Sequence, residues 1–217
     1  MTKKSVSLST LVNAGLHSQR FSKDTMRIIA GTRRGMKLLS PKTNQSRPIT
    51  DRVKESLFDV LFNYGLPQGC RVADLFCGVG SLGLESLSRG AEFVTFVELD
   101  SGVAAILAQN IEKAQFVGES KVVRADAFKI GAPLGSDGQK YGIVFIDPPY
   151  ADTENVAEGS PLAQLLDILQ SQVAERGIVT VRTYEKMSLL DRYGRFKVFE
   201  HRRWGTMNVT ILQNVDE

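Results

Sequence analysis

The alternation of short apolar runs with helix-like segments after residue 70 places the strongest restriction on how this chain of 217 residues can fold. The runs are of β type and cover residues 71–76, 93–97, 121–124, 143–147 and 178–182. Segments of helical periodicity separate them near residues 82–89, 101–115 and 161–174. Continuous apolar strands joined by helices are typical of a parallel sheet that is buried on both faces. We therefore predict an α/β fold.

Two later runs change the topology at the end of the chain. Residues 196–201 and 207–213 follow one another through the turn-like pair Trp204 and Gly205, with no helical segment between them. Strands joined by a tight turn pair antiparallel. We expect a seven-stranded sheet that is mostly parallel, with one antiparallel strand near the C-terminal edge.

The segment before residue 65 has a different pattern. Residues 26–39 contain two apolar runs around the centre Gly31-Thr32-Arg33-Arg34-Gly35, which predicts a β-hairpin with arginines at its tip. Pro48 breaks the pattern, and Thr50 or Asp51 can cap a helix that runs to about Tyr64. Residues 1–25 are rich in Ser and Thr and are interpreted as a flexible extension. A transit peptide and a start-site artefact are the alternatives for this extension.

Charge is divided unevenly along the chain. Residues 1–54 hold twelve lysines and arginines against two acidic residues, a formal charge of +10, and the remaining residues sum to −7. A basic segment on an acidic body indicates a polyanionic partner, because lysine and arginine neutralise phosphates. A solvated basic tail without a specific target is the alternative.

Composition excludes several classes of protein. The chain is 42% hydrophobic and 24% charged, as in ordinary globular proteins, and no apolar run approaches the length of a membrane span. The first residues lack the apolar core of a secretory signal. The two cysteines, Cys70 and Cys77, are too few for a disulfide framework or a zinc site. We expect a cytoplasmic protein without a metal.

A glycine-rich loop follows the first predicted strand. Gly78, Gly80 and Gly83 satisfy the pattern G-x-G-x-x-G between a strand and a helix, where glycines permit a tight turn and close approach of a ligand to the backbone. Glu98 ends the second strand, 18 residues past Gly80, where a carboxylate can accept hydrogen bonds from ribose hydroxyls. The glycine loop and Glu98 together fit either a dinucleotide or S-adenosylmethionine as ligand. A tight structural turn with a surface acid is the alternative.

Two further acids bear on that choice. Asp74 ends the first strand, where a carboxylate can act through the loop backbone on the ammonium of a methionine moiety but would repel a pyrophosphate. Asp126, after the third strand, is placed to accept from the exocyclic amine of adenine, or it is a helix cap. We therefore favour the methyl donor, with Phe76 of the loop also assigned to its binding site.

The motif Asp147-Pro148-Pro149-Tyr150 ends the fourth predicted strand. Two consecutive prolines donate no N–H, so the backbone here is a stiff rim that exposes carbonyl oxygens. The Asp147 carboxylate and the Pro148 carbonyl can accept from both N–H groups of a nucleobase amine and so aim its lone pair at a methyl group. Tyr150 offers a ring on which the base can stack. A turn that ends a buried strand is the alternative.

Other residues are weaker candidates. Cys77 lies beside no group that would activate it as a nucleophile, and neither His17 nor His201 has a partner at metal-ligand spacing. The residues Arg202, Arg203 and Trp204 add to an RNA surface or are solvated.

Several segments together resemble one family. They are RIIAGTRRGMKL (residues 27–38), RPITDRVKESLFDVL (47–61), DLFCGVGSLGLESLSRGA (74–91), FVELD (96–100) and FIDPPY (145–150). They closely resemble the bacterial 16S ribosomal RNA guanine-N2 methyltransferases of the RsmD type. The resemblance covers residues 26 to about 212 and implies a class I methyltransferase fold of Rossmann-like type, S-adenosylmethionine as donor with S-adenosylhomocysteine as product, and one guanine of small-subunit ribosomal RNA, conventionally numbered 966, as acceptor. The family usually lacks residues like 1–25.

The predicted organisation has three parts. They are a flexible basic extension (1–25), an RNA-contacting hairpin and helix (26–64) and a methyltransferase domain (65–217). We expect a monomer that acts on small-subunit ribosomal RNA or an assembling 30S subunit. The residues expected to contact phosphates are Arg27, Arg33, Arg34, Arg47 and Arg52.

Three alternatives remain open at this point. An amino-methyltransferase for adenine N6 or cytosine N4 of DNA or RNA would use the same Asp-Pro-Pro-Tyr motif. A nicotinamide-dependent oxidoreductase would use the glycines and Glu98 but leaves that motif unexplained. A non-catalytic RNA-binding or assembly factor would need no cofactor.

Overall fold

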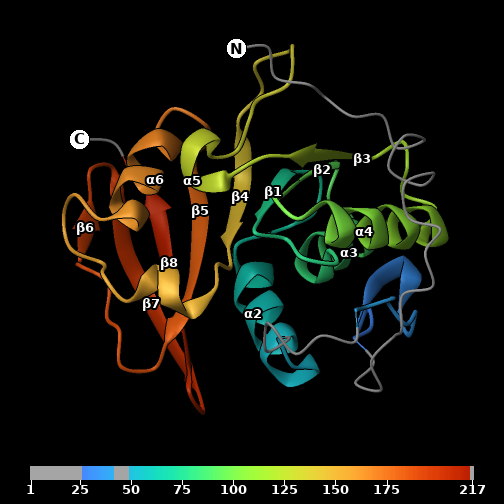
Figure 1. Ribbon diagram of the computed structural model, residues 1–217, viewed down its shortest axis with the longest axis horizontal. Helices are drawn as coiled ribbons and strands as arrows, with labels where there is room; N and C mark the ends of the chain where they lie inside the picture. The colour runs from blue at the N-terminus through green and yellow to red at the C-terminus, as the bar shows by residue number, and fades with distance from the viewer. Residues whose placement is uncertain (1–25, 42–48, 216–217) are drawn as a thin grey trace.

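The computed structural model describes residues 26–41 and 49–215 (Figure 1). The predictions for residues 1–25, Arg47 and Pro48 lie outside the described residues, as does the side chain of Tyr150. One eight-stranded sheet has the strand order β3-β2-β1-β4-β5-β8-β7-β6. An α/β fold is confirmed.

Five neighbouring strands of the sheet are parallel: β1 (Arg71–Leu75), β2 (Phe93–Glu98), β3 (Ser120–Arg124), β4 (Tyr141–Ile146) and β5 (Val173–Tyr184). They coincide with the five predicted apolar runs, although β5 begins five residues early. β1 lies in the middle between β2 and β4, with Leu75 opposite Val97 and Ile146. The carboxyl ends of these three strands therefore meet at one edge of the sheet.

The remaining strands alternate in direction. β8 (Met207–Asn214) pairs antiparallel with β5, and β7 (Phe196–Trp204) pairs antiparallel with β8, as predicted. The expected count of seven strands is wrong, because the two-residue strand β6 (Arg192–Tyr193) adds an eighth. The sheet thus contains two reversed strands, β8 and β6, instead of one. A strand of two residues is too short to show an apolar period.

The helices are α2 (Asp51–Asn63), α3 (Ser81–Ser88), α4 (Ser101–Ala114), α5 (Ala127–Ile130) and α6 (Pro161–Leu169), with 3-10 turns η1 (Gly31–Arg33) and η2 (Tyr150–Thr153). Side-chain caps mark the start of every α-helix in this set except α3. Thr50 accepts from the N–H of Val53 at the start of α2, and Asp100 accepts from Val103 at the start of α4. The helix predicted over residues 161–174 ends at Leu169, because the chain enters β5 at Val173.

The sheet is covered on both faces (Figure 1). Val72 of β1 belongs to the core under α2, α3 and α4, and its neighbour Ala73 belongs to the core under α6. Successive side chains of a strand point to opposite faces, so the strands must be apolar throughout. Burial of each large apolar side chain contributes about 1.5–3 kcal/mol to stability.

Residues 26–39 reverse direction as predicted. The N–H of Ile28 donates to the Met36 carbonyl at 2.9 Å, and the N–H of Leu38 donates to the Met26 carbonyl at 2.7 Å. The strands of this hairpin are reduced to one antiparallel bridge, between Arg27 and Lys37. Its turn is η1, which lies against α3.

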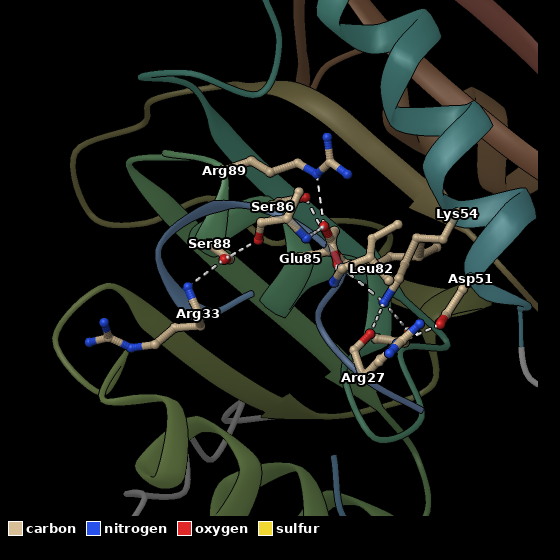
Figure 2. Close-up of polar contacts among 12 residues, drawn as sticks. Arg27, Arg33, Asp51, Lys54, Leu82, Glu85, Ser86, Ser88 and Arg89 are labelled. Carbon is tan, nitrogen blue, oxygen red and sulfur yellow. Dashed lines mark hydrogen bonds and ion pairs between the residues drawn. The ribbon is translucent and has the colours of Figure 1, made fainter. Parts of the chain in front are cut away.

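A buried ionic cluster holds the hairpin on the body of the protein (Figure 2). The Glu85 carboxylate on α3 accepts from the N–H groups of Ile29 and Ala30 at 2.8 and 3.0 Å. It also forms ion pairs with Lys54 of α2 at 3.2 Å and with Arg89 at 2.8 Å. Burial lowers the pKa of Lys54, and the attraction of Glu85 opposes that shift. One carboxylate therefore joins the hairpin, α2 and α3.

Candidate active site

The glycine loop, Glu98 and Asp147 meet at the carboxyl edge of the sheet. Cys77 in the loop donates its N–H to the Val97 carbonyl at 3.2 Å, and Asp147 donates its N–H to the Leu75 carbonyl at 3.4 Å. Crevices at the carboxyl ends of parallel strands are where ligands bind in open α/β sheets. The structure thus brings the three sequence motifs together.

The loop after β1 turns through three residues of positive φ: Phe76 at 56°, Gly78 at 55° and Gly80 at 87°. Packing explains two of the glycines. A Cβ on Gly80 would lie 2.4 Å from Leu107, and a Cβ on Gly83 would lie 2.3 Å from the ring of Phe96. A Cβ on Gly78 would meet no atom within 4 Å, so the loop is open at that point.

Glu98 holds the loop in place. Its Oε2 accepts from the N–H of Gly78 at 2.9 Å, and its Oε1 accepts from the N–H of Asp100 at 2.9 Å. A carboxylate has about four acceptor positions. Glu98 can therefore brace the loop and still accept hydrogen bonds from a ligand at the strand end.

Asp74 lies beneath the loop and is buried. Its Oδ2 accepts from the N–H of Gly83 at 2.8 Å, which fixes the first turn of α3. Burial raises the pKa of Asp74 well above its ordinary value, and the nearby charges of Asp147 and Glu98 raise it further. The prediction that Asp74 acts on a ligand through the loop backbone depends on its hydrogen bond with Gly83.

An aromatic pair stands beside the loop. The rings of Phe76 and Phe128 lie 4.8 Å apart at 58°. Asp126 caps α5: it accepts from the N–H of Phe128 at 3.1 Å and pairs with Lys129 at 3.3 Å. The helix-cap interpretation of Asp126 is confirmed. Phe128 was not predicted as a site residue. The signal that could have identified it is an aromatic residue two positions after an acid that follows a strand.

Asp147 follows β4 and forms an ion pair with Arg182 of β5, through Oδ1 and Nε. The Asp147 side chain is 19% exposed and that of Arg182 is 10% exposed. Burial raises the pKa of Asp147, and the guanidinium of Arg182 opposes this shift. Pro148 is buried and Pro149 is exposed. Sequence reasoning missed Arg182, because its role depends on the register of β5 against β4.

These residues fit S-adenosylmethionine. The described loop over residues 76–83 contains no lysine or arginine, and the carboxyl groups of Glu98 and Asp147 at the same edge each interact with Asp74. A pyrophosphate would meet repulsion there, whereas the cationic methionine moiety of the methyl donor would not. Glu98 suits the ribose, and Phe76 with Phe128 presents an apolar surface of the kind that an adenine ring contacts.

The predicted phosphate-binding arginines occupy different environments. Arg27 pairs with Asp51 at 2.7 Å on the surface, and Arg34 and Arg52 are exposed. Arg33 is half-buried and donates to the Ala114 carbonyl at 2.7 Å. Its guanidinium also lies 5.3 Å from the ring centroid of Phe116. Arg33 thus docks the hairpin turn on α4, and RNA contact by this group stays a prediction.

The weaker candidates have structural roles. Cys77 is buried and its pKa is raised by burial, which disfavours a thiolate nucleophile. His201 lies 3.1 Å from the hydroxyl of Thr210, Arg202 pairs with Glu200, and Arg203 pairs with Glu185. Within the described ranges no three metal-ligating side chains gather into a site, and no helix is both long and apolar enough to cross a bilayer.

Comparison with known proteins agrees with this geometry. The model of the family described as Conserved hypothetical protein 95 matches residues 26–213. The chain belongs to this family. The match covers the hairpin, α2 and the sheet together, so the family includes the N-terminal segment as well as the body. The resemblance to RsmD-type enzymes is confirmed by relatives that carry that name.

One such relative is Ribosomal RNA small subunit methyltransferase D of Escherichia coli (strain K12), 37% identical over 163 residues, which are 72% of this chain and 79% of the relative. The same-named protein of Haemophilus influenzae is 40% identical over 59% of this chain and 66% of its own length. Among solved structures, the yhhF protein of Escherichia coli, which is assigned as a methyltransferase, is 29% identical with a TM-score of 0.73 and covers 89% of this chain and 99% of its own. The methyltransferase fold is therefore confirmed.

Proposed function

We propose that this protein transfers a methyl group from S-adenosylmethionine to the exocyclic N2 amine of a guanine in small-subunit ribosomal RNA. The observation that carries the proposal is the position of Asp147-Pro148-Pro149-Tyr150 at the end of β4, in register with the glycine loop after β1. The names of the relatives in the family support ribosomal RNA as the acceptor.

The methyl donor would be held by residues of the first three strand ends. Bound S-adenosylmethionine supplies an electrophilic methyl group on a sulfonium. Glu98 accepts from the ribose hydroxyls, and Asp126 accepts from the adenine amine with the oxygen capacity that its capping bond leaves. The contacting rings of Phe76 and Phe128 offer the adenine ring an apolar surface, and the loop from Gly78 to Gly83, braced by Asp74, receives the methionine moiety.

The rim after β4 would orient the acceptor amine. An exocyclic amine is a poor nucleophile because its lone pair is delocalised into the ring. The Asp147 carboxylate and the Pro148 carbonyl accept from its two N–H groups, and Pro149 adds no competing donor. Tyr150 is proposed to stack on the base. Guanine must leave its stack to reach this rim, which costs least in an RNA loop or bulge.

The proton needs no strong base. The amine becomes acidic as its nitrogen is alkylated, and its proton passes to the Asp147 carboxylate or to water. Most of the rate enhancement then comes from holding amine and methyl group in line. The carboxylates and carbonyls of the site suffice for this step. Burial raises the pKa of the nearby Cys77 thiol, which disfavours a thiolate there.

Recognition of RNA is assigned to the basic N-terminal part. We propose that residues 26–64 contact the RNA through Arg27, Arg34, Arg47 and Arg52, with Arg33 docking the hairpin turn, and that residues 65–217 carry the chemistry. The acceptor is the RNA or an assembling 30S subunit, and a cytoplasmic monomer would meet either one.

The test uses the purified full-length protein with S-adenosylmethionine labelled in the methyl group and small-subunit RNA from cells that lack this protein. We expect label in N2-methylguanosine after digestion and mass analysis of the nucleosides. Label in N6-methyladenosine or N4-methylcytidine, or transfer to duplex DNA in preference to RNA, would contradict the proposal. Calorimetry that detects tight NAD binding and no S-adenosylmethionine binding would favour the oxidoreductase instead.

A further inference from the structure

Asp147 and Arg182 are neighbours by strand register. β4 and β5 are parallel, with Ile146 opposite Val181. Asp147, directly after β4, and Arg182 of β5 therefore lie next to one another. Their side chains meet there in the ion pair between Oδ1 and Nε. Arg182 is thus built into the sheet beside the proposed acceptor of the guanine amine.

The surroundings of this pair are largely apolar. A small cavity beside it is lined by Ile49, Leu57, Leu82, Ile146, Thr180 and Val209 together with Asp147 and Arg182. The pair supplies the only charged groups among these lining residues. The lining side chains from α2, α3 and β8 are uncharged, and Asp74 of β1 is the titratable group that interacts with the charge of Asp147; the raised pKa of Asp74 favours its neutral form. Removal of Arg182 would therefore leave the Asp147 carboxylate without a cationic partner in largely apolar surroundings.

We propose that Arg182 is a positioning residue that keeps the Asp147 carboxylate ionised and fixed in rotation, so that it accepts from the guanine amine. This inference rests on the proposed function and adds a positioning residue beside its acceptor rim. A protonated carboxyl group accepts only through its carbonyl oxygen and more weakly than a carboxylate, and its O–H opposes an amine that is itself a donor, so the hydrogen bond that aims the lone pair would be weakened.

Two opposing effects on the pKa of Asp147 set the direction in which pH changes activity. Burial raises the pKa of Asp147 and the guanidinium of Arg182 lowers it. Without Arg182, the carboxylate forms only at higher pH. Activity that depends on the ionised form should then be lost over a wider acidic range.

The first experiment measures kcat and KM for methyl transfer to guanine from about pH 5 to 9, with Arg182→Met and Arg182→Lys variants. For Arg182→Met we expect kcat at neutral pH to fall roughly 10–100-fold, the range typical of a residue that orients a functional group through a hydrogen bond. We also expect the acidic limb of kcat to move to higher pH. Arg182→Lys keeps the positive charge and should restore the position of the limb. Affinity for S-adenosylmethionine, measured by calorimetry, should stay within about twofold, because the donor site lies over β1 and β2.

The matched control is Arg176→Gln, which removes an exposed arginine from the opposite end of the same strand. This variant should keep the wild-type pH profile. An Arg182→Met enzyme with reduced kcat and an unmoved acidic limb would overturn the inference, because a merely structural loss lowers activity at every pH.

A double-mutant cycle keeps the inference testable if Arg182→Met alone folds poorly. Asp147→Asn removes the buried charge that Arg182 balances, so the double variant leaves no unpaired carboxylate at this position. If Arg182 acts through Asp147, its replacement in the Asp147→Asn background should change kcat by less than about threefold. Equal losses in both backgrounds would refute the inference. Absence of guanine methylation by the wild-type protein would instead refute the proposed function, so the two failures are distinguishable.

Discussion

Lys54 of α2 and Glu85 of α3 form an ion pair of 3.2 Å, and both side chains are buried. The Lys54 ammonium also donates to the Arg27 carbonyl at 2.6 Å and to the Ser81 hydroxyl at 3.3 Å. Ser81 is the first residue of α3, directly after the glycine loop. The cluster therefore connects the N-terminal hairpin with the helix that begins at the proposed cofactor site (Figure 2).

Replacement of Glu85 by Ala tests this connection. The change leaves the Lys54 ammonium without its counter-ion and two hairpin N–H groups without an acceptor. Removal of one partner of a buried pair costs about 3–5 kcal/mol. We expect the free energy of unfolding in urea to fall by that amount. Glu112→Ala on the exposed face of α4 is the control and should change it by less than about 0.5 kcal/mol. A loss of unfolding free energy in Glu85→Ala no larger than that in Glu112→Ala would show that the cluster contributes little to the stability of the fold.

The packing of α3 on β2 gives a second prediction. In Gly83→Ala the new methyl group would lie 2.3 Å from the Phe96 ring and 2.9 Å from Val94. Overpacking of this kind costs about 1–3 kcal/mol. Gly118→Ala is the matched control, because its Cβ would meet no atom within 4 Å. We expect thermal unfolding of Gly83→Ala at a clearly lower temperature than that of Gly118→Ala. Equal midpoints would show that the helix shifts to admit the methyl group.

The five parallel strands were predictable because strands covered on both faces must be apolar along their whole length. The longer β5 was not, since Glu175, Arg176 and Gly177 interrupt its apolar run. The short elements η1, η2 and β6 show no full period and were missed, whereas α5, also four residues long, was anticipated through its cap Asp126.

Residues whose role depends on tertiary contacts could not be found in this way. Arg182 gains its role from lying opposite the end of β4, and Phe128 of α5 from meeting Phe76 of the loop after β1. Arg33 illustrates the converse. The sequence displays its charge but not the Ala114 carbonyl and Phe116 ring on which it rests.

The burial of Asp74 predicts a pH dependence of stability. The pKa of Asp74 is raised in the folded state, so the folded protein holds this proton more tightly than the unfolded chain does. Stability should therefore fall as pH rises from the ordinary Asp range through the raised folded pKa, and be highest below that window. In Asp74→Asn this contribution is absent. We expect urea titrations to show a smaller decline of unfolding free energy with pH for Asp74→Asn than for wild type. Parallel curves would contradict the assignment.

The environments of the hairpin arginines separate RNA contact from docking. Arg34 is exposed, so in Arg34→Ala we expect unchanged stability and weaker RNA binding. The plot of log affinity against log salt concentration should become shallower by about 0.7, the value for one phosphate contact to a single strand. Arg33→Ala loses the bond to the Ala114 carbonyl and the packing on Phe116, and should lower the free energy of unfolding by about 1–2 kcal/mol. Filter binding at several salt concentrations and urea unfolding measure the two effects. A shallower salt slope for Arg33→Ala with an unchanged slope for Arg34→Ala would reverse the two roles.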